Sequence, residues 1–335
     1  MQNISATLNK SDKIRRTALS PAQDSLTFYK DRIINGDALE ELAKIPDGIF
    51  NMCVTSPPYW GLRDYGKDGQ IGLEKTPEEY IEKLVAIFRE VRRTLRDDGT
   101  LWLNLGDSYA TQHAVGTKDD DTGWKHGKLS KGYQARTGCP MGLKPKDLCG
   151  IPWRVAFALQ ADGWWLRQDI IWAKPNPMPE SVKDRCTKSH EYIFLLSKNK
   201  IYYFDADAIK ENGTISAGTK GAKGSEERYS QVGVNSRPPE YKIYDGKRNK
   251  RSVWTVPTKP FSEAHFAVFP PDLIVPCILA GCPEGGIVLD PFFGSGTTGE
   301  VANRLGRYFC GIELNEKYIE IAQRRTQKLD MFLSK

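Results

Sequence analysis

The sequence predicts an α/β fold with a doubly wound, mostly parallel sheet. Three observations support this prediction: short apolar runs alternate with segments of helical periodicity, one run stops at a pair of prolines, and another ends in a glycine-rich turn. Alternating strand and helix patterns are typical of parallel sheets with helices on both faces. Because such sheets bind ligands at the carboxyl ends of their strands, we expect a site at these two turns.

The first half of the chain begins with a strand that ends in Gly36-Asp37. Asp37 is suited to cap the following helix, and it is also placed to bind a nucleoside. Thr76, Pro77 and Glu79 form a strong helix start, with the threonine as N-cap and the glutamate completing a capping box. The elements expected here are strands at 32–38, 49–56 and 100–105, and helices at 39–43 and from Thr76 to a stop at Gly99.

The second half continues the alternation. The expected elements are helices at 147–163, 271–281 and 316–332, a helix that follows Gly299 and runs through Leu305, and strands at 165–172, 191–197, 287–290 and 307–314. Pro276 interrupts one of these helices. Lys174-Pro-Asn-Pro177 forms a second rigid proline segment after a strand.

Three segments lack periodicity and divide the chain. Residues 1–27 are expected to be a loose N-terminal extension, and residues 108–147 a mobile loop. Residues 205–255 are polar and basic and form an insertion. The expected organisation is therefore a catalytic half at 28–204, the insertion, and a second half at 256–335.

Composition narrows the class of protein. The chain has 335 residues, no apolar stretch near 18 residues, and a polar N-terminus, so neither a membrane span nor a secretory signal is expected. Its 7 cysteines include no Cys-x-x-Cys pair and its 4 histidines are scattered, which disfavours a metal site and indicates a reducing cytoplasm. The net charge of +6 is compatible with nucleic acid but is weak support by itself.

The stretch Thr55-Ser-Pro-Pro-Tyr-Trp60 forms a stiff ledge at the end of a strand. Its prolines cannot donate to a sheet, and the residue before a proline is held extended. The ledge offers one hydroxyl, rigid carbonyls and two aromatic rings, which could stack on a flat ring and accept hydrogen bonds from an exocyclic amine. When this stretch is considered by itself, a proline-rich turn with a surface aromatic residue is an equally good interpretation.

The stretch Asp290-Pro-Phe-Phe-Gly-Ser-Gly-Thr-Thr298 opens a glycine pattern between a strand and a helix, and Glu313 ends the next strand. This arrangement allows close approach of a cofactor, with the acidic residue on ribose hydroxyls. The glycines alone are also compatible with NAD. Asp290 suits the ammonium of an amino-acid ligand better than a pyrophosphate, and the absence of a lysine after the glycines excludes a P-loop.

Together the two motifs resemble the amino-group DNA methyltransferases that use S-adenosylmethionine. Further stretches that resemble the family are Asn35-Gly-Asp-Ala-Leu39, Trp172-Ala-Lys-Pro-Asn-Pro-Met-Pro179, His190-Glu-Tyr-Ile193 and Phe269-Pro270. The resemblance covers about residues 30–330, and the catalytic motif precedes the cofactor motif, as in the permuted beta group. It implies a Rossmann-like class I methyltransferase fold with circularly permuted motifs, in which the insertion is the target-recognition region.

The resemblance also implies roles for individual residues. Ser56 and the Pro57 carbonyl would accept hydrogen bonds from the target amine, supported by Pro58, while Tyr59, with Trp60, would stack on the extruded base. The expected cofactor residues are Asp37, His265, Phe269, Pro270, Asp290, Pro291, Phe292, Gly294, Ser295, Gly296, Thr297, Thr298 and Glu313. The expected DNA-binding residues are Trp60, Lys174, Asn176, Arg237, Lys247, Arg248, Lys250 and Arg251.

The sequence thus predicts a site-specific methyltransferase that acts on the N4 amine of a flipped cytosine in double-stranded DNA. Family members with serine at position 56 mostly methylate cytosine N4, and those with aspartate mostly methylate adenine N6, so N6-adenine is the alternative. No covalent cysteine is required, since C5-cytosine methylases use Pro-Cys and this chain has only Cys139-Pro140. An RNA or protein-glutamine methylase, an NAD-dependent oxidoreductase and an inactive DNA-binding module are further alternatives. The choice between monomer and homodimer, and a cognate restriction endonuclease, stay open.

Overall fold

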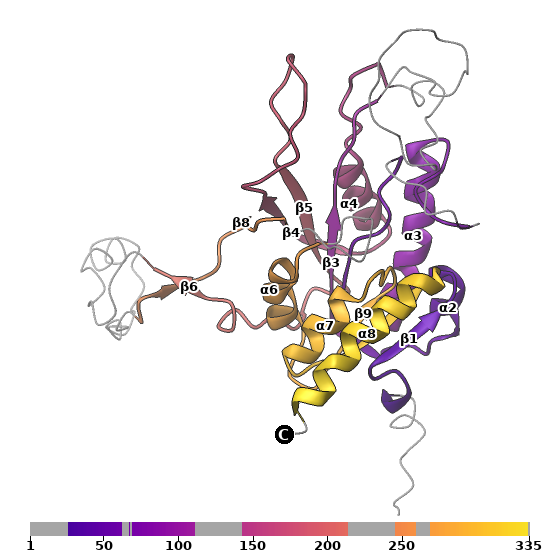
Figure 1. Ribbon diagram of the computed structural model, residues 1–335, viewed down its shortest axis with the longest axis vertical. Helices are drawn as coiled ribbons and strands as arrows, with labels where there is room; N and C mark the ends of the chain where they lie inside the picture. Colours follow the sequence, from indigo (N-terminus) through magenta and orange to yellow (C-terminus); the bar gives the residue numbers. More distant parts are fainter. Residues whose placement is uncertain are drawn as a thin grey trace, which may run out of the picture.

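The computed structural model describes residues 26–61, 67, 69–110, 143–213, 245–258 and 269–333. Its centre is an eight-stranded sheet in the order β1-β10-β9-β2-β3-β5-β4-β8 (Figure 1). The first five strands are mutually parallel, β5 is antiparallel to both neighbours, and β8 is parallel to β4. The predicted mostly parallel sheet is therefore confirmed. The bounds are β1 Arg32–Asn35, β10 Tyr308–Glu313, β9 Ile287–Asp290, β2 Phe50–Thr55, β3 Leu95–Leu105, β5 His190–Ser197, β4 Trp165–Ala173 and β8 Val253–Thr255.

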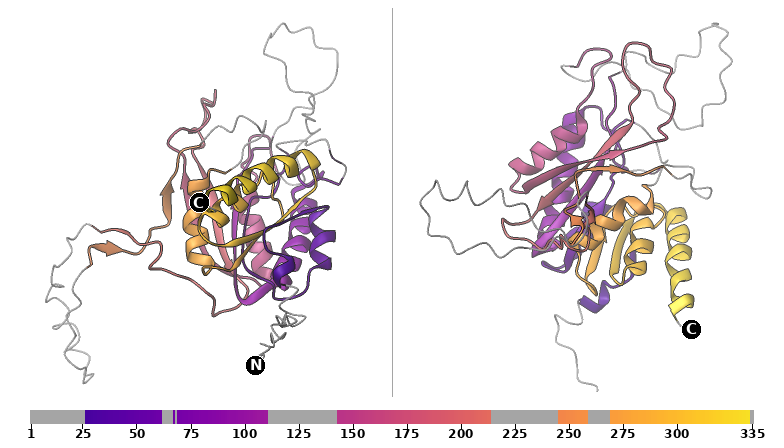
Figure 2. Two further views of the ribbon diagram at one scale, coloured as in Figure 1. Left: turned by 60° about the horizontal axis from the view of Figure 1, so that its bottom comes forward. Right: turned by 90° about the vertical axis from the view of Figure 1, so that its left-hand side faces the viewer.

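Helices cover both faces of the sheet (Figure 2). On one face lie α2 (Ala38–Lys44), α3 (Pro77–Thr94) and α4 (Ile151–Ala161), and on the other lie α6 (Pro271–Gly281), α7 (Thr297–Arg304) and α8 (Glu316–Leu333). The alternation of strand side chains explains the two cores: in β3, Leu101 and Leu103 pack on the first face and Trp102 on the second. No helix within the described ranges is long and apolar enough to cross a membrane.

Two helix boundaries differ from the prediction. Helix α3 starts as predicted, with the Thr76 hydroxyl accepting from the Glu79 amide at 3.2 Å, but it ends at Thr94 instead of Gly99. Leu95 pairs with Phe50 of β2, so sheet pairing takes over before the local helical pattern stops. Helix α4 starts at Ile151, after Gly150 in the left-handed region with φ of 67°, and Asp147 belongs to the preceding turn.

The non-periodic segments are only partly described. Residues 1–25 and 111–142 lie outside the described residues, but the ends of the 108–147 loop pair with each other, because the Ala110 amide donates to the Asp147 carbonyl at 2.8 Å. The described ends of the insertion form a two-stranded ribbon, β6 (Glu211–Asn212) and β7 (Lys247–Arg248), which projects from the sheet (Figure 1). Strand β8 ends at Thr255, the last residue of the predicted insertion, so the insertion as predicted contains a strand that pairs with β4 of the main sheet.

Candidate active site

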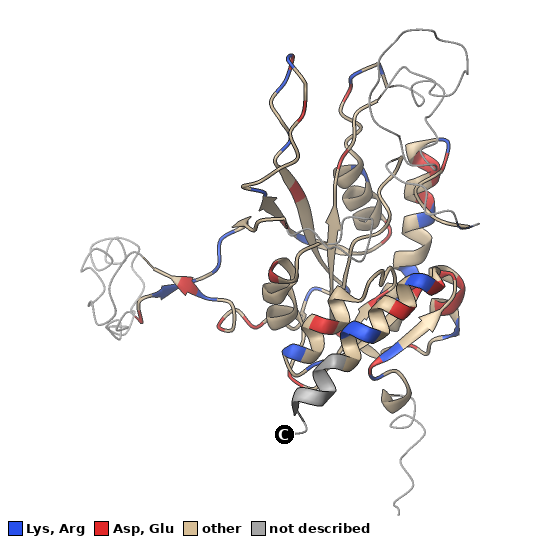
Figure 3. Ribbon diagram, in the orientation of Figure 1, with Lys and Arg blue, Asp and Glu red and all other residues tan. Residues whose placement is uncertain are grey.

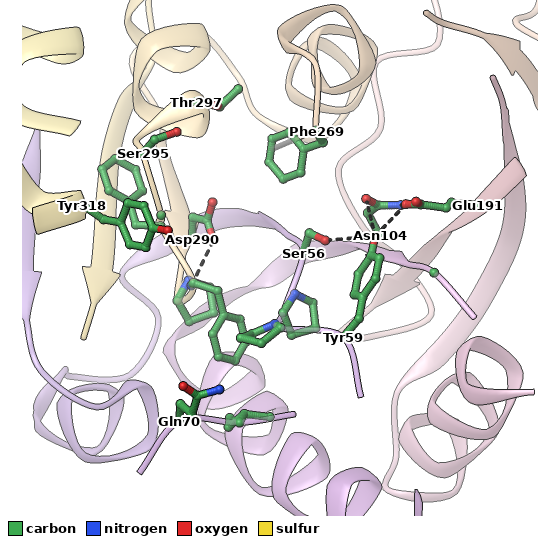
Figure 4. Close-up of a pocket in the computed structure, with 18 of the residues that line it drawn as sticks. Ser56, Tyr59, Gln70, Asn104, Glu191, Phe269, Asp290, Ser295, Thr297 and Tyr318 are labelled. Atoms are coloured by element: carbon green, nitrogen blue, oxygen red, sulfur yellow. Dashed lines mark hydrogen bonds between the residues drawn. The ribbon is translucent and has the colours of Figure 1, made fainter. Parts of the chain in front are cut away.

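The two sequence motifs meet at the point where the chain order of the sheet changes. Strand β9 lies beside β2, and both end at the same edge. There the Thr55 hydroxyl donates to Asp290 Oδ1 at 2.6 Å across 235 positions of sequence. A cavity of about 880 Å³ opens at this edge and is lined by residues from both motifs (Figure 4). A topological switch point is where open α/β sheets bind ligands.

Asp290 is the buried acidic centre of the cavity, with 2% of its surface exposed. Its Oδ1 accepts from Thr55 and, at 3.0 Å, from the Phe292 amide, while Oδ2 accepts from the Thr298 hydroxyl at 2.6 Å. Burial nevertheless raises the pKa of Asp290 from 3.8 to about 6. A carboxylate has about four acceptor positions, so the donors of the described chain leave one on Oδ2 for a cationic ligand.

The glycine-rich turn after β9 is fixed by backbone geometry and by an arginine. Gly294 and Gly296 have φ of 53° and 82°, and a Cβ on Gly296 would lie 2.8 Å from the Ala322 Cβ. From α8, Arg325 donates to the Ser295 carbonyl at 2.9 Å and to the Thr297 hydroxyl at 3.1 Å. The turn is therefore preorganised against the cavity.

Glu313 lines the cavity at the end of β10, the strand beside β9. Its carboxylate accepts from the Gly294 and Asn315 amides, both at 2.7 Å, and burial raises its pKa. Tyr318 of α8 also lines the cavity (Figure 4). Asp37 also lines this region, but one of its oxygens caps α2 by accepting from the Leu39 amide at 2.9 Å. Asp37 therefore caps α2 as expected and lines the cavity, while its binding to a nucleoside stays a prediction.

The proline ledge forms the other end of the cavity. Ser56 is half-buried, and its hydroxyl donates to the Tyr59 hydroxyl oxygen at 3.4 Å. Tyr59 in turn donates to Glu191 Oε2 at 2.6 Å, and burial, reinforced by the charge of Glu191, raises the tyrosine pKa well above 10.0. The Tyr80 hydroxyl donates to the Pro58 carbonyl at 2.9 Å, which fixes the ledge from α3. Within the described part of the chain the Ser56 hydroxyl serves only as a donor, so its lone pairs are left to accept from a ligand.

Glu191 is held by two further groups. The Asn104 amide nitrogen lies 3.3 Å from Glu191 Oε2 and 3.0 Å from the Tyr192 carbonyl. Lys174 forms an ion pair with Glu191 and lies 4.2 Å from the centre of the Trp172 ring. Figure 4 shows Ser56, Tyr59, Asn104 and Glu191 as one cluster, on the other side of Asp290 from Ser295 and Tyr318. We call the part of the cavity around Ser56 and Tyr59 the hydroxyl end, and the part around Asp290 and Glu313 the acidic end.

Three of the predicted DNA-binding residues have internal partners: the role predicted for Trp60 is wrong, and those of Lys174 and Asn176 stay predictions. Trp60 is 3% exposed and donates its indole N–H to the Glu74 carbonyl at 3.1 Å, so its ring belongs to the core and cannot stack on a base. Lys174 is neutralised inside the site by Glu191. The Asn176 amide is occupied by Thr258, donating to its carbonyl at 3.1 Å and accepting from its N–H at 2.9 Å.

The basic residues of the insertion are partly neutralised. Arg248 and Arg251 both pair with Glu211, at 2.9 and 2.7 Å, and Lys250 lies over the Trp254 ring at 5.1 Å. The cluster that includes Lys247 stands on the projecting ribbon (Figure 3). Its role in DNA binding stays a prediction.

The remaining predicted site residues divide into two groups. Phe269, Pro291, Phe292 and Pro57 line the cavity with the residues above, and Pro270 caps the start of α6 beside it. Arg237 and His265 lie outside the described residues.

Cavity-lining residues that sequence reasoning did not single out include Asn104, Lys188, Glu191 and Tyr318. Asn104 is a polar residue within an apolar strand, which was a usable indication. Lys188 has a buried ammonium with no hydrogen-bond partner among the described residues, and burial lowers its pKa. The described residues contain no group of three or more His, Cys, Asp or Glu side chains able to hold a metal.

Comparison with known proteins assigns the family. The sequence model described as DNA methylase, of the N6 and N4 type, matches residues 50–324. The type II methyltransferase M.SmaI of Serratia marcescens is 51% identical over 294 residues, covering 88% of this chain and 90% of the relative. M.Cfr9I of Citrobacter freundii is 48% identical over 298 residues, covering 89% and 88%.

Solved structures share the fold. The PvuII DNA methyltransferase, described as cytosine-N4-specific, has a TM-score of 0.57 at 18% identity and covers 90% of each chain. A DNA modification methylase of Thermus thermophilus, TTHA0409, solved with S-adenosyl-L-methionine, has a TM-score of 0.55 at 22% identity and covers 89% of this chain and 93% of its own. The sequence matches, together with a fold that joins the proline ledge to the glycine-rich turn, show that the chain belongs to the N6 and N4 DNA methylase family and is a type II DNA methyltransferase.

Proposed function

We propose that this methyltransferase transfers the methyl group of S-adenosyl-L-methionine to the N4 amine of a cytosine extruded from duplex DNA. The observation that carries the proposal is the direct link between the two ends of the cavity. Thr55, whose hydroxyl binds Asp290, is adjacent in sequence to Ser56. A group bound at the acidic end therefore lies within one cavity of a base bound at the hydroxyl end.

The acidic end fits the cofactor. We assign the ammonium of its methionine part to the remaining acceptor position on Asp290, within the turn formed by residues 292–298. We assign the ribose hydroxyls to Glu313, and the adenine to the region between Asp37 and Tyr318. When bound there, the sulfonium supplies an already activated methyl group.

The hydroxyl end fits an aromatic amine. The lone pair of such an amine is delocalised into its ring, so the amine is a poor nucleophile. The Ser56 hydroxyl directs its hydrogen to Tyr59, which leaves lone pairs to accept one amine hydrogen, and the Pro57 carbonyl accepts the other. These two acceptors would rotate the amine and localise its lone pair toward the methyl group, so that catalysis comes from positioning and electrostatics.

Tyr59 provides the stacking surface for the base. Its hydroxyl is anchored by Glu191, which Asn104 and Lys174 hold, and its ring packs against Gly106, where a Cβ would lie only 2.5 Å from Cε2. The base must leave the helical stack to reach this surface, at a cost of a few kcal/mol in unstacking.

The choice of cytosine N4 rests on Ser56. Serine is neutral and accepts from the amine while its hydrogen stays directed to Tyr59, and members of the family with serine here mostly act on cytosine. Adenine N6 is the alternative on the same site. The projecting β6–β7 ribbon, with Lys247 and Arg248, supports binding to a large duplex target.

A nucleoside assay tests the proposal. The purified protein is incubated with unmethylated genomic DNA and S-adenosyl-L-methionine, the DNA is digested, and the methylated nucleoside is identified by mass spectrometry. N4-methylcytosine supports the proposal, and N6-methyladenine replaces the base while keeping the mechanism. Methylation of RNA or protein without methylation of DNA overturns it. Sequencing the methylated DNA then gives the recognition site.

A further inference from the structure

The segment that follows β4 is unusually rigid for a loop. Residues 174–179 alternate with Pro175, Pro177 and Pro179, so each intervening residue precedes a proline and is held extended. At its start, the Lys174 amide donates to the Ser189 carbonyl at 2.8 Å. At its end, Glu180 accepts from Arg185 at 2.6 Å and from the Lys188 amide at 3.1 Å. The segment therefore holds its side chains in fixed places.

Met178 is the one residue of this segment, apart from the prolines, that has an apolar side chain. Met178 is 86% exposed, although it also lines the cavity, so it lies at the cavity mouth. The adjacent Asn176, clamped by its two hydrogen bonds to Thr258, ties the segment to the chain that follows β8. Scattered exposed apolar residues are common in proteins and need no function. Here, however, the prolines and the clamp keep the methionine from folding inward to bury itself.

The position of Met178 relative to the ledge follows from strand direction. Strand β4 is antiparallel to β5, and β5 is antiparallel to β3, so β4 ends at the same edge of the sheet as β3 and β2. Met178 and Ser56 therefore lie at one edge and share one cavity. Any duplex that delivers a base to Ser56 must present the base stack to this edge.

We propose that Met178 is the wedge that enters the duplex where the target base leaves it. Extrusion leaves a gap in the stack, with apolar faces above and below it. Methionine is unbranched and polarisable, fits irregular gaps and makes favourable contacts with aromatic rings. Apolar side chains inserted between base steps are a recurrent way for proteins to stabilise distorted DNA. The inference rests on the proposed action on an extruded base in duplex DNA.

The test compares full-length wild type with Met178→Ala, Met178→Leu and Ile201→Ala. Ile201 is a matched control, since it is 84% exposed but follows the end of β5 at the opposite edge of the sheet. The substrate is a duplex carrying the mapped recognition site, with either cytosine or a fluorescent cytosine analogue at the target position. Fluorescence of the analogue, measured with S-adenosyl-L-homocysteine bound, reports extrusion without turnover.

We expect Met178→Ala to lower both the extrusion signal and kcat/KM on the duplex by roughly 10- to 100-fold, the range for losing a buried methionine side chain. Met178→Leu should stay within about threefold of wild type, because it restores the apolar volume. Ile201→Ala and the cofactor affinity of all variants should be unchanged.

Two results would overturn the wedge while leaving the proposed function intact: a Met178→Ala variant that extrudes and methylates like wild type, or one whose loss is matched by weaker cofactor binding. A wild type that methylates no duplex DNA would instead overturn the proposed function and the wedge with it. The nucleoside assay on wild type separates these cases before any variant is compared.

Discussion

Asp290 offers the sharpest test of how the cavity holds its cofactor. Burial raises its pKa from 3.8 to about 6, and one pH unit corresponds to about 1.36 kcal/mol. Keeping this carboxylate charged in the free protein at pH 7.5 therefore costs about 3 kcal/mol of stability. The sign follows from linkage: the folded protein holds the proton more tightly than the unfolded chain, so stability falls as the pH rises from 3.8 to about 6 and is constant above.

Asp290→Asn removes the negative charge and keeps the shape of the side chain. An asparagine oxygen can still accept from Thr55 and the Phe292 amide, and the Thr298 hydroxyl can rotate to accept from the new amide. We expect the free variant to be more stable than wild type at pH 7.5, by up to about 3 kcal/mol, with the difference shrinking toward pH 4. Urea unfolding at several pH values measures it.

Cofactor binding should change in the opposite direction. If Asp290 faces the ammonium, S-adenosyl-L-methionine binds the charged carboxylate, so wild-type affinity should weaken about tenfold per pH unit below about 6. Asp290→Asn should bind weakly, with little pH dependence over that range. Isothermal titration calorimetry at several pH values measures the cofactor affinity of the wild type and of the variant. A variant that binds as tightly as wild type with the same pH profile would refute the assignment of Asp290 to the ammonium.

Three further substitutions probe the hydroxyl end. Ser56→Ala should lower kcat by about 10²-fold or more with cofactor affinity unchanged, measured by methyl incorporation and calorimetry, and unchanged turnover would remove Ser56 from the mechanism. Tyr59→Phe keeps the ring but takes the hydrogen-bond partner from both Ser56 and Glu191, so kcat should fall by about 10- to 100-fold; wild-type kcat would show that the anchor is dispensable. Gly106→Ala places a Cβ 2.5 Å from the Tyr59 ring, so kcat should fall about tenfold or more while circular dichroism stays native, and an active variant would mean that the ring has room to move.

Much of the fold could be predicted from local patterns. Apolar runs marked the strands, and Thr76 with Glu79 marked the start of α3. The end of α3 could not be predicted in this way, because Leu95 leaves the helix to pair with Phe50, a partner 45 positions away in the chain. Local helical pattern yields wherever a distant strand competes for the same backbone.

Residues of the candidate site could be predicted where a single sequence motif contains them. They were harder to predict where strand pairing brings together residues that are far apart in the sequence. Ser56 and Asp290 stood in the two main motifs, whereas Asn104 meets Glu191, from the His190–Ile193 stretch, only because β5 pairs with β3 beside the ledge. Trp60 misled because adjacency to Tyr59 suggested a shared role. The two side chains have different surroundings: Tyr59 lines the cavity, and Trp60 is buried in the core.

The hydrogen bond between Thr55 and Asp290 also bears on how such a chain can be rearranged. The two halves of the site are held together by neighbouring strands and not by consecutive residues. Their order along the sequence can therefore be exchanged without separating them in space. The joining stretch passes through the β6–β7 ribbon, which stands off the sheet and contributes no strand to it (Figure 1). A change in this ribbon can therefore leave β2 and β9, the paired strands that carry Thr55 and Asp290, in place.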